Sequence, residues 1–291
     1  MRPTVIRQPG PAEAPRIAAV EARGRSFEFD LAAGETLLAG IARGFAAAGF
    51  VSGTVHLGQV EFSPFAYVMP ALSTTGEHAA FYSETYRPAG VSRLDCGSLT
   101  FGTRDGLPFL HCHAQWWEAD GKFTGGHILP DEARVATRVR VQAFGLSGAV
   151  FDARPDPETN FKLFTPFACP EVAAQTNCRV LALRLKPNQD LIEAIETAAK
   201  QHDFRRAIIR GGVGSTIGAS FEGNPIIENF ATEVYLTNGV IRPDATGQPR
   251  CVGVSAALVD YTGAVQRGSV VKGANPVLMT FELLLVAPET D

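Results

Sequence analysis

The sequence of 291 residues has no long apolar run, and no stretch of it approaches the roughly 18 apolar residues that a membrane-spanning helix needs. Its first residues, 1–11, also lack the apolar centre of a secretory signal peptide. Cysteine is scarce: five residues are scattered along the chain without a C-x-x-C spacing, which argues against a disulfide framework. We therefore expect a cytoplasmic protein in a reducing compartment, with no membrane segment.

Positive charge is also in short supply, because 26 Lys and Arg face 30 Asp and Glu, for a net charge of −4. Such a chain gains no general attraction to a phosphate backbone, so its bulk charge gives no support to direct DNA binding. The composition is 45% hydrophobic and 19% charged, which is enough apolar material for sizeable cores. The length fits two domains of ordinary size.

Three of the six histidines, His111, His113 and His127, fall in one short stretch that reads as a β-hairpin around Asp120-Gly121. Side chains alternate along a strand, so His111 and His113 share a face. A three-residue loop, 119–121, would place His113 opposite His127, with His111 diagonally within reach. A two-residue loop would turn His127 to the other face, unless a bulge at the glycines 125–126 restored it.

Three imidazoles converging on one face, without an obvious fourth protein ligand, are typical of an open transition-metal site. We predict that His111, His113 and His127 bind a metal. Zinc is the first choice, and nickel, cobalt or ferrous iron are alternatives, because neutral imidazole suits all of them. The competing interpretation is that the three are half-buried strand histidines held by ordinary hydrogen bonds.

A strand followed by an amphipathic helix occurs twice in the chain. Residues 25–31 and 179–185 are strand-like, and helices are expected to begin near Gly34 and near Asn188, which we expect to be the N-cap of the second helix. Both helices show the same i, i+1, i+4, i+8 spacing of apolar residues. The two stripes are Leu37, Leu38, Ile41 and Phe45 in the first helix, and Leu191, Ile192, Ile195 and Ala199 in the second.

Further strands follow each helix, with a glycine turn expected at residue 58 in the first copy and at residues 211–214 in the second. Each copy then closes with a strand, at 135–144 and 277–286. This order predicts an α+β fold of two tandem units, each a mostly antiparallel sheet with one main helix packed on it. The expected organisation is a flexible tail (1–15), a unit with the histidines (20–146), a Pro-containing linker (147–176) and a degenerate unit (177–287).

Alignment of the two copies on the glycines of their hairpin turns, Gly121 and Gly263, tests the metal hypothesis. All three histidines are replaced together in the second copy, as a shared ligand role would predict. The residues that take the places of His111, His113 and His127 are Gly253, Ser255 and Ser269.

The hairpin closely resembles the central motif of the plants and prokaryotes conserved (PPC) domain, in its bacterial form. Phe109–His113, Asp120-Gly121 and Gly125–Leu129 match the family pattern HxH, D-G, G-G-H-L. The second copy resembles the same family at Glu233–Gly239 and at Gly212–Ser215. In that alignment the first copy has Cys96 where the second has Glu233.

The resemblance covers both units and implies an α+β domain that forms homo-oligomers, typically trimers. Plant members carry AT-hook DNA-binding motifs, but here Ser26 replaces the proline that the Arg23-Gly24-Arg25 segment would need. A more distant similarity is to zinc-dependent α-acetolactate decarboxylase, which also has an HxH…H pattern.

Two classes of function remain open. In the first, the histidine site acts on or senses a small molecule; as an enzyme the protein would be a metal-dependent lyase or hydrolase, with its catalytic residues unknown. Glu61, Glu84, Arg87 and Arg104 are candidates for assisting groups on residue type alone, and His56 is a weak candidate for a further ligand. In the second, the protein is a non-catalytic regulatory module, associated with DNA, or a scaffold.

Overall fold

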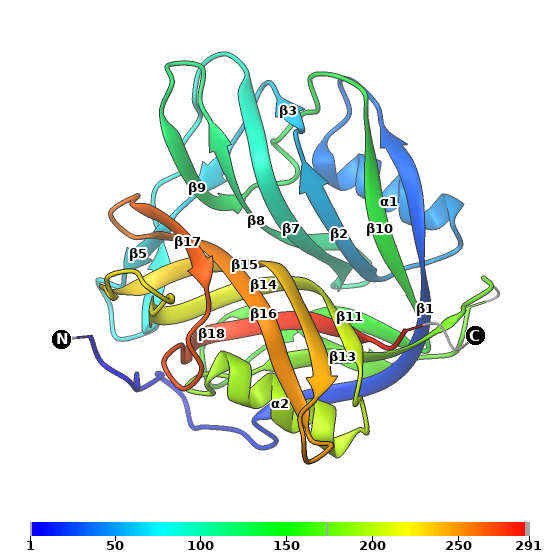
Figure 1. Ribbon diagram of the computed structural model, residues 1–291. Helices are drawn as coiled ribbons and strands as arrows, with labels where there is room; N and C mark the ends of the chain where they lie inside the picture. The colour runs from blue at the N-terminus through cyan, green and yellow to red at the C-terminus, as the bar shows by residue number, and fades with distance from the viewer. Residues whose placement is uncertain (1, 173, 289–291) are drawn as a thin grey trace.

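Figure 1 shows the computed structural model of the protein, in which residues 2–172 and 174–288 are described. Residue 1 of the expected tail and residue 173 of the expected linker lie outside the described residues. The helices are α1 (Leu37–Ala47) and α2 (Leu191–Gln201). The strands are β1 (Ile17–Leu31), β2 (Gly53–Gly58), β3 (Glu61–Phe62), β4 (Tyr67–Val68), β5 (Pro70–Leu72), β6 (Ala80–Tyr82), β7 (Ser92–Arg104), β8 (Leu107–Trp117), β9 (Phe123–Ile128), β10 (Val139–Ser147), β11 (Ala149–Pro155), β12 (Lys162–Ala168), β13 (Cys178–Leu185), β14 (Ala207–Ala219), β15 (Ile227–Pro243), β16 (Pro249–Asp260), β17 (Val265–Ser269) and β18 (Val277–Val286).

Most strands join one large sheet, in the order β17-β16-β15-β14-β18-β13-β1-β10-β2-β7-β8-β9-β4. The pairings along this path are antiparallel, which confirms the expectation of a mainly antiparallel sheet with few helices. We call residues 17–147 the first half and residues 178–286 the second half. Outward from the β1–β13 pair, both halves show the same order: the opening strand, the closing strand and then four intermediate strands in sequence, with β4 added beyond β9 in the first half.

The two halves meet along β1 and also face each other. Strand β1 pairs with β10 over its C-terminal part and with β13 over its N-terminal part, so one strand belongs to both ladders. The halves then lie one above the other in Figure 1, where β14 contacts β7 and β16 contacts β9. Each helix packs into a core of its own half.

Both helices begin where a side chain satisfies free backbone N–H groups. Thr36 caps α1 by accepting a hydrogen bond from the Ala39 amide. Asp190, and not Asn188 as expected, caps α2, and it accepts from the amides of Ile192 and Glu193. Asn188 has a positive φ of 64° and instead exchanges hydrogen bonds with the backbone of Ile6.

The glycines at 211–214 form no turn, contrary to the expectation. Strand β14 continues through them, and its pairing with β18 shifts between Arg210 and Val213. Gly211 and Gly212 have φ values of 67° and 110°, which an extra bulge residue in a strand can adopt most easily as glycine. The local glycine content therefore marks a bulge and not a chain reversal.

The segments outside the two halves pack against them. The Gln8 amide donates to the Leu278 carbonyl, and Arg16 pairs with the buried Glu158. Strands β11 and β12 pair with each other as a hairpin, which we call the connecting hairpin (residues 149–168). Neither of the two helices in the described part of the chain is long and apolar enough to cross a membrane.

Candidate metal site

The hairpin of β8 and β9 has the three-residue loop that favours a shared histidine face. The Glu118 amide donates to the Lys122 carbonyl, and Gly121 takes the left-handed conformation with a φ of 89°. His113 is therefore paired directly with His127, as expected. The alternating residue Cys112 is buried on the other face of β8, in the core that contains α1.

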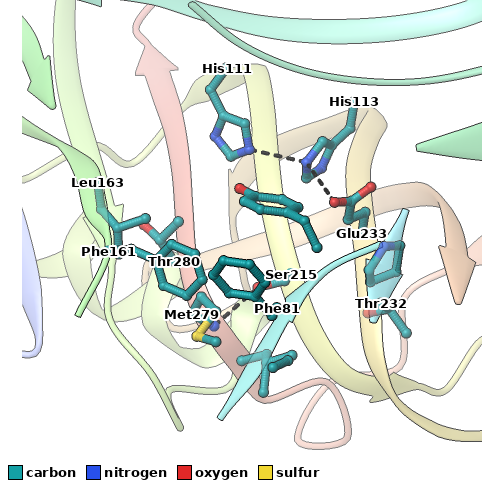
Figure 2. Close-up of a pocket in the computed structure, with 15 residues that line it drawn as sticks. Phe81, His111, His113, Phe161, Leu163, Ser215, Thr232, Glu233, Met279 and Thr280 are labelled. Atoms are coloured by element: carbon teal, nitrogen blue, oxygen red, sulfur yellow. Dashed lines mark hydrogen bonds and ion pairs between the residues drawn. The ribbon is translucent and has the colours of Figure 1, made fainter. Parts of the chain in front are cut away.

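The three imidazoles converge on one point. Ligand nitrogens from His111, His113 and His127 all lie within 4.8 Å of one another, and the Nε2 atoms of His111 and His113 are 3.1 Å apart. His113 is buried, and the other two are partly buried. Figure 2 shows His111 and His113 pointing toward each other.

The second half fixes the orientation of two of the rings. The His113 Nδ1 donates to the Val234 carbonyl of β15 over 3.1 Å. The His111 Nδ1 lies 2.8 Å from the Glu282 carboxyl group of β18, which is fully buried. A carbonyl and a carboxylate are acceptors, so each Nδ1 carries the proton and each Nε2 keeps its lone pair.

This arrangement fits a transition-metal ion. Two Nε2 lone pairs that face each other repel, and a cation between them removes that repulsion. Zinc–nitrogen distances of about 2.0–2.1 Å in a tetrahedral site place two ligand nitrogens about 3.3 Å apart, close to the separation of the two Nε2 atoms. A carboxylate that receives the second ring N–H of a ligating histidine is also the usual outer partner of a metal site.

A second carboxyl group from β15 faces the same point. The Glu233 Oε1 lies 3.9 Å from the His113 Nε2, and its Oε2 is buried without a hydrogen-bond partner in the described residues. Burial raises the pKa of Glu233 well above its ordinary value, because a carboxylate is poorly solvated there. Glu233 is thus a buried acid beside the histidines with one oxygen, Oε2, that has no hydrogen-bond partner in the described residues, and a cation there would stabilise its charged form.

Burial also favours the neutral form of two of the histidines, His113 and His127. It lowers the pKa of His127 to about 3, with a further contribution from the charge of His111. Burial and the charges of the two neighbouring histidines likewise lower the pKa of His113 well below its ordinary value. Neutral imidazole is the form that binds metals, so His113 and His127 are in the form that a metal ion would need.

Glu282 continues into a buried polar network. Its other carboxyl oxygen accepts from the Thr280 hydroxyl, which accepts from the Arg184 guanidinium. Arg184 in turn forms a 2.5 Å ion pair with Asp156 of the loop in the connecting hairpin. This chain of contacts links His111 to a loop that neither half contains.

Two hollows adjoin the histidines. The smaller one, of about 60 Å³, is lined by His111 and His113 together with Glu233 and the hydroxyl-bearing Ser215 and Thr280 (Figure 2). The larger one is an open groove of about 650 Å³ beside His111 and His127. Tyr82 of β6 lines both hollows, and its ring lies 5.3 Å from that of His127.

Of the assisting groups suggested by residue type, only Arg104 lines either hollow. Glu61 and Arg87 form ion pairs elsewhere, with Arg93 and Glu132. Glu84 lines neither hollow. His56 lies in a separate pocket between the halves, with its Nε2 3.9 Å from the Cys96 sulfur, so it is not a further ligand in this arrangement.

The sequence analysis missed Glu233 and Glu282 as parts of this site. Both follow the histidines by more than a hundred residues, and only the packing of the halves brings them close. A signal was nonetheless present for Glu282, because it is an acidic residue inside the nearly all-apolar strand β18, whereas β15 around Glu233 is mixed in polarity. Such residues are almost never fully buried without a partner.

The second half repeats the hairpin geometry without the histidines. Ser255 pairs with Ser269 as His113 pairs with His127, and Gly263 repeats the positive φ of Gly121. The same ladders correct one detail of the alignment. In the second half, Glu233 pairs with Val259, which follows Ser255 by four residues. In the first half, the residue four after His113 is Trp117, and it pairs with Arg93. Arg93, and not Cys96, is therefore the counterpart of Glu233.

Comparison with protein families gives a match, and it covers the second half. Residues 172–287 match the Plants and Prokaryotes Conserved (PCC) domain, the family also called PPC. The matched residues supply Glu233, Val234 and Glu282, but none of the three histidines. None of the curated proteins compared with the chain matches it significantly.

The similar solved structures are shorter than this chain, and each matches about half of it. A plant- and prokaryote-conserved (PPC) protein from Pyrococcus horikoshii has 19% identity and a TM-score of 0.41, and the match covers 52% of this chain and 97% of that one. A metal-containing protein from Archaeoglobus fulgidus has 20% identity and a TM-score of 0.39, covering 49% and 94%. A candidate DNA-binding protein from Ralstonia eutropha has 17% identity and a TM-score of 0.36, covering 49% and 90%.

Proposed function

We propose that the protein consists of two PCC-like units, at 20–146 and 177–287, and binds a divalent transition metal through His111, His113 and His127. Zinc is the first choice of metal. The site acts on or senses a small molecule, and the protein works in the cytoplasm as a homo-oligomer, with a trimer as the expected form.

One observation carries this proposal. The Nε2 atoms of His111 and His113 face each other at 3.1 Å while both Nδ1 atoms are committed to acceptors. In histidines that only stabilised a strand, two nitrogen lone pairs directed at one point would repel each other without compensation. The buried Glu233 beside them, whose Oε2 has no hydrogen-bond partner among the described residues, supports the same interpretation.

The second unit then has a structural and orienting role. Its strand order repeats that of the first, and its hairpin keeps the same turn, which supports duplication. It supplies Val234 and Glu282 as hydrogen-bond acceptors for the ligand histidines. A copy that holds the ligands of its neighbour in place needs no histidines of its own.

The chemistry of the site follows from its donors. A metal held there would act as a Lewis acid toward a carbonyl, carboxyl or water oxygen. Glu233 is placed to hold or accept a proton at its carboxyl oxygens, and the Ser215 and Thr280 hydroxyls can orient a small ligand in the adjoining cavity. In catalytic form this is a metal-dependent lyase or hydrolase, and in non-catalytic form a metabolite sensor.

Elemental analysis of the purified protein tests the metal directly. We expect close to one transition-metal ion per chain, lost in the His111→Ala/His113→Ala variant. The matched control is His202→Ala, because that residue lies at the end of α2 and pairs with Glu21, away from the site. This control should keep the metal content of the wild type.

The absence of metal from wild-type protein refolded with zinc, nickel, cobalt and iron in turn would contradict the proposal. That result would favour the alternative, a non-catalytic regulatory or scaffold function. Light scattering of the purified protein tests the oligomer independently, and a monomer would contradict the expected trimer.

A further inference from the structure

The larger groove beside the histidines is built from aromatic side chains. Phe81 and Tyr82 come from β6, Phe161 from the connecting hairpin and Phe109 from β8, and all four line the groove together with His111 and His127. Phe81 stacks on Phe161 with ring centroids 5.8 Å apart and an interplanar angle of 28°. Three separate elements thus contribute rings to one wall.

These rings are not fully covered. Phe81 is 46% exposed and Tyr82 is 38% exposed, although both lie in a groove and not on a convex surface. Exposed aromatic surface of this kind is costly and marks sites that bind an apolar partner. The groove volume of about 650 Å³ lies within the range of small-molecule binding sites.

The charges of the lining residues identify the polar end of that molecule. Lys162 is paired with Asp105, and Glu132 with Arg87. The Arg104 guanidinium lies 5.1 Å from the Phe109 ring centroid, and no carboxyl group forms an ion pair with it in the described part of the chain. Asp131 is the one lining carboxyl group that likewise lacks a basic partner among the described residues.

We propose that this groove binds a small aromatic carboxylate as the ligand or substrate of the histidine site. The ring lies among Phe81, Tyr82 and Phe161, where aromatic pairs add to simple burial. The carboxylate carries one negative charge shared by two oxygens, and Arg104 and a metal held by the histidines would both attract it. This inference rests on the proposed metal function, and it names the class of molecule on which that function operates.

Calorimetric titration of the full-length, zinc-loaded protein with benzoate tests the inference. We expect saturable binding of benzoate, about fivefold weaker binding of cyclohexanecarboxylate, and no measurable binding of benzyl alcohol. Arg104→Gln should weaken benzoate binding about tenfold, the effect of losing one charge-assisted hydrogen bond. Arg205→Gln is the matched control: Arg205 pairs with Asp203 at the exposed surface and lines neither hollow, so this variant should bind benzoate as the wild type does.

Zinc content and the thermal midpoint are measured on the same samples, so the two proposals can fail separately. Normal zinc content without benzoate binding, or with equal binding by Arg104→Gln, overturns the inference and leaves the metal site standing. Equal affinity for benzoate and cyclohexanecarboxylate also overturns it, because the aromatic wall would then confer no selectivity. A folded protein that takes up none of zinc, nickel, cobalt and iron overturns the metal site and, with it, this inference.

Discussion

At the scale of single residues, the histidine site depends on acceptors far along the chain. His111 is oriented by Glu282, which follows it by 171 residues and has no exposed surface. His113 is oriented by a backbone carbonyl, which no side-chain substitution can remove. Glu282 is therefore the residue through which the orientation of the ligands can be tested.

Glu282→Gln should weaken metal binding about tenfold to a hundredfold while the protein stays folded. The amide keeps the shape of the side chain but no longer offers the His111 N–H a charged acceptor. Competition with a chromophoric chelator measures the affinity. Glu61→Gln, which alters a carboxyl group paired with Arg93 away from both hollows, should bind metal as the wild type does.

If the two substitutions had the same effect, Glu282 would have no orienting role. The histidines themselves could be predicted from sequence, because a hairpin brings residues close through local register. Glu233 and Glu282 could not, because their position depends on how two distant strands pack against β8.

At the scale of elements, the connecting hairpin is tied to the second half by a buried ion pair. Arg184 of β13 and Asp156 have side chains that are only 4% exposed, and Thr159 also donates to Asp156. Removal of one partner leaves the other charge buried and uncompensated, which is strongly destabilising. The hairpin thus depends on Asp156 for its attachment beside the site.

Asp156→Ala should lower the free energy of unfolding by about 3 kcal/mol, as measured by urea denaturation at neutral pH. Arg205→Ala is the control, because it removes an ion pair with Asp203 whose side chains are 70% and 73% exposed. Exposed pairs contribute little, so this variant should unfold almost as the wild type does. An equal loss in both variants would contradict the role assigned to Asp156.

The same ion pair predicts a dependence on pH. Burial alone would raise the pKa of Asp156, but the Arg184 charge and the hydrogen bonds from Arg184 and Thr159 outweigh it and hold the pKa below its ordinary value. The contribution to stability is therefore full above the unfolded-state pKa of about 4 and is lost as the pH falls through the lower folded-state value. The stability difference between wild type and Asp156→Ala should shrink below about pH 4.

Helices and strands could be predicted from the sequence, because their apolar residues recur at a regular spacing. The apolar stripes located both helices, and the closing strand predicted at 277–286 agrees with β18. The cap of α2 was placed two residues early, because Asn188 is used by the N-terminal segment. The glycines at 211–214 predicted a turn, but they form a bulge in β14, because glycine at positive φ occurs in both structures.

At the scale of the whole molecule, the two halves complete each other. Strand β1 carries hydrogen-bonding ladders to both β10 and β13, and the sheet faces that meet enclose the histidines. The repeated pattern of strands could be recognised in the sequence. The face-to-face packing could not, because period-two alternation shows that a face is buried but not what covers it.

A chain that ends at residue 176 should bind metal much more weakly than the full protein. It keeps all three histidines but loses the Val234 carbonyl, Glu233 and Glu282, and it leaves the N-terminal part of β1 unpaired. Elemental analysis and circular dichroism of both chains measure this together. Full metal content in the shorter chain would show that the second half is dispensable for the site.

The pairing of His111 with Glu282 also has a consequence for inheritance. A gene segment that encoded only one half could not be exchanged for its counterpart from a relative without separating a ligand from the group that orients it. Substitutions in β8 and β18 would instead have to spread as matched sets. If the histidines bind a metal as proposed, the two halves would therefore be selected together and not separately.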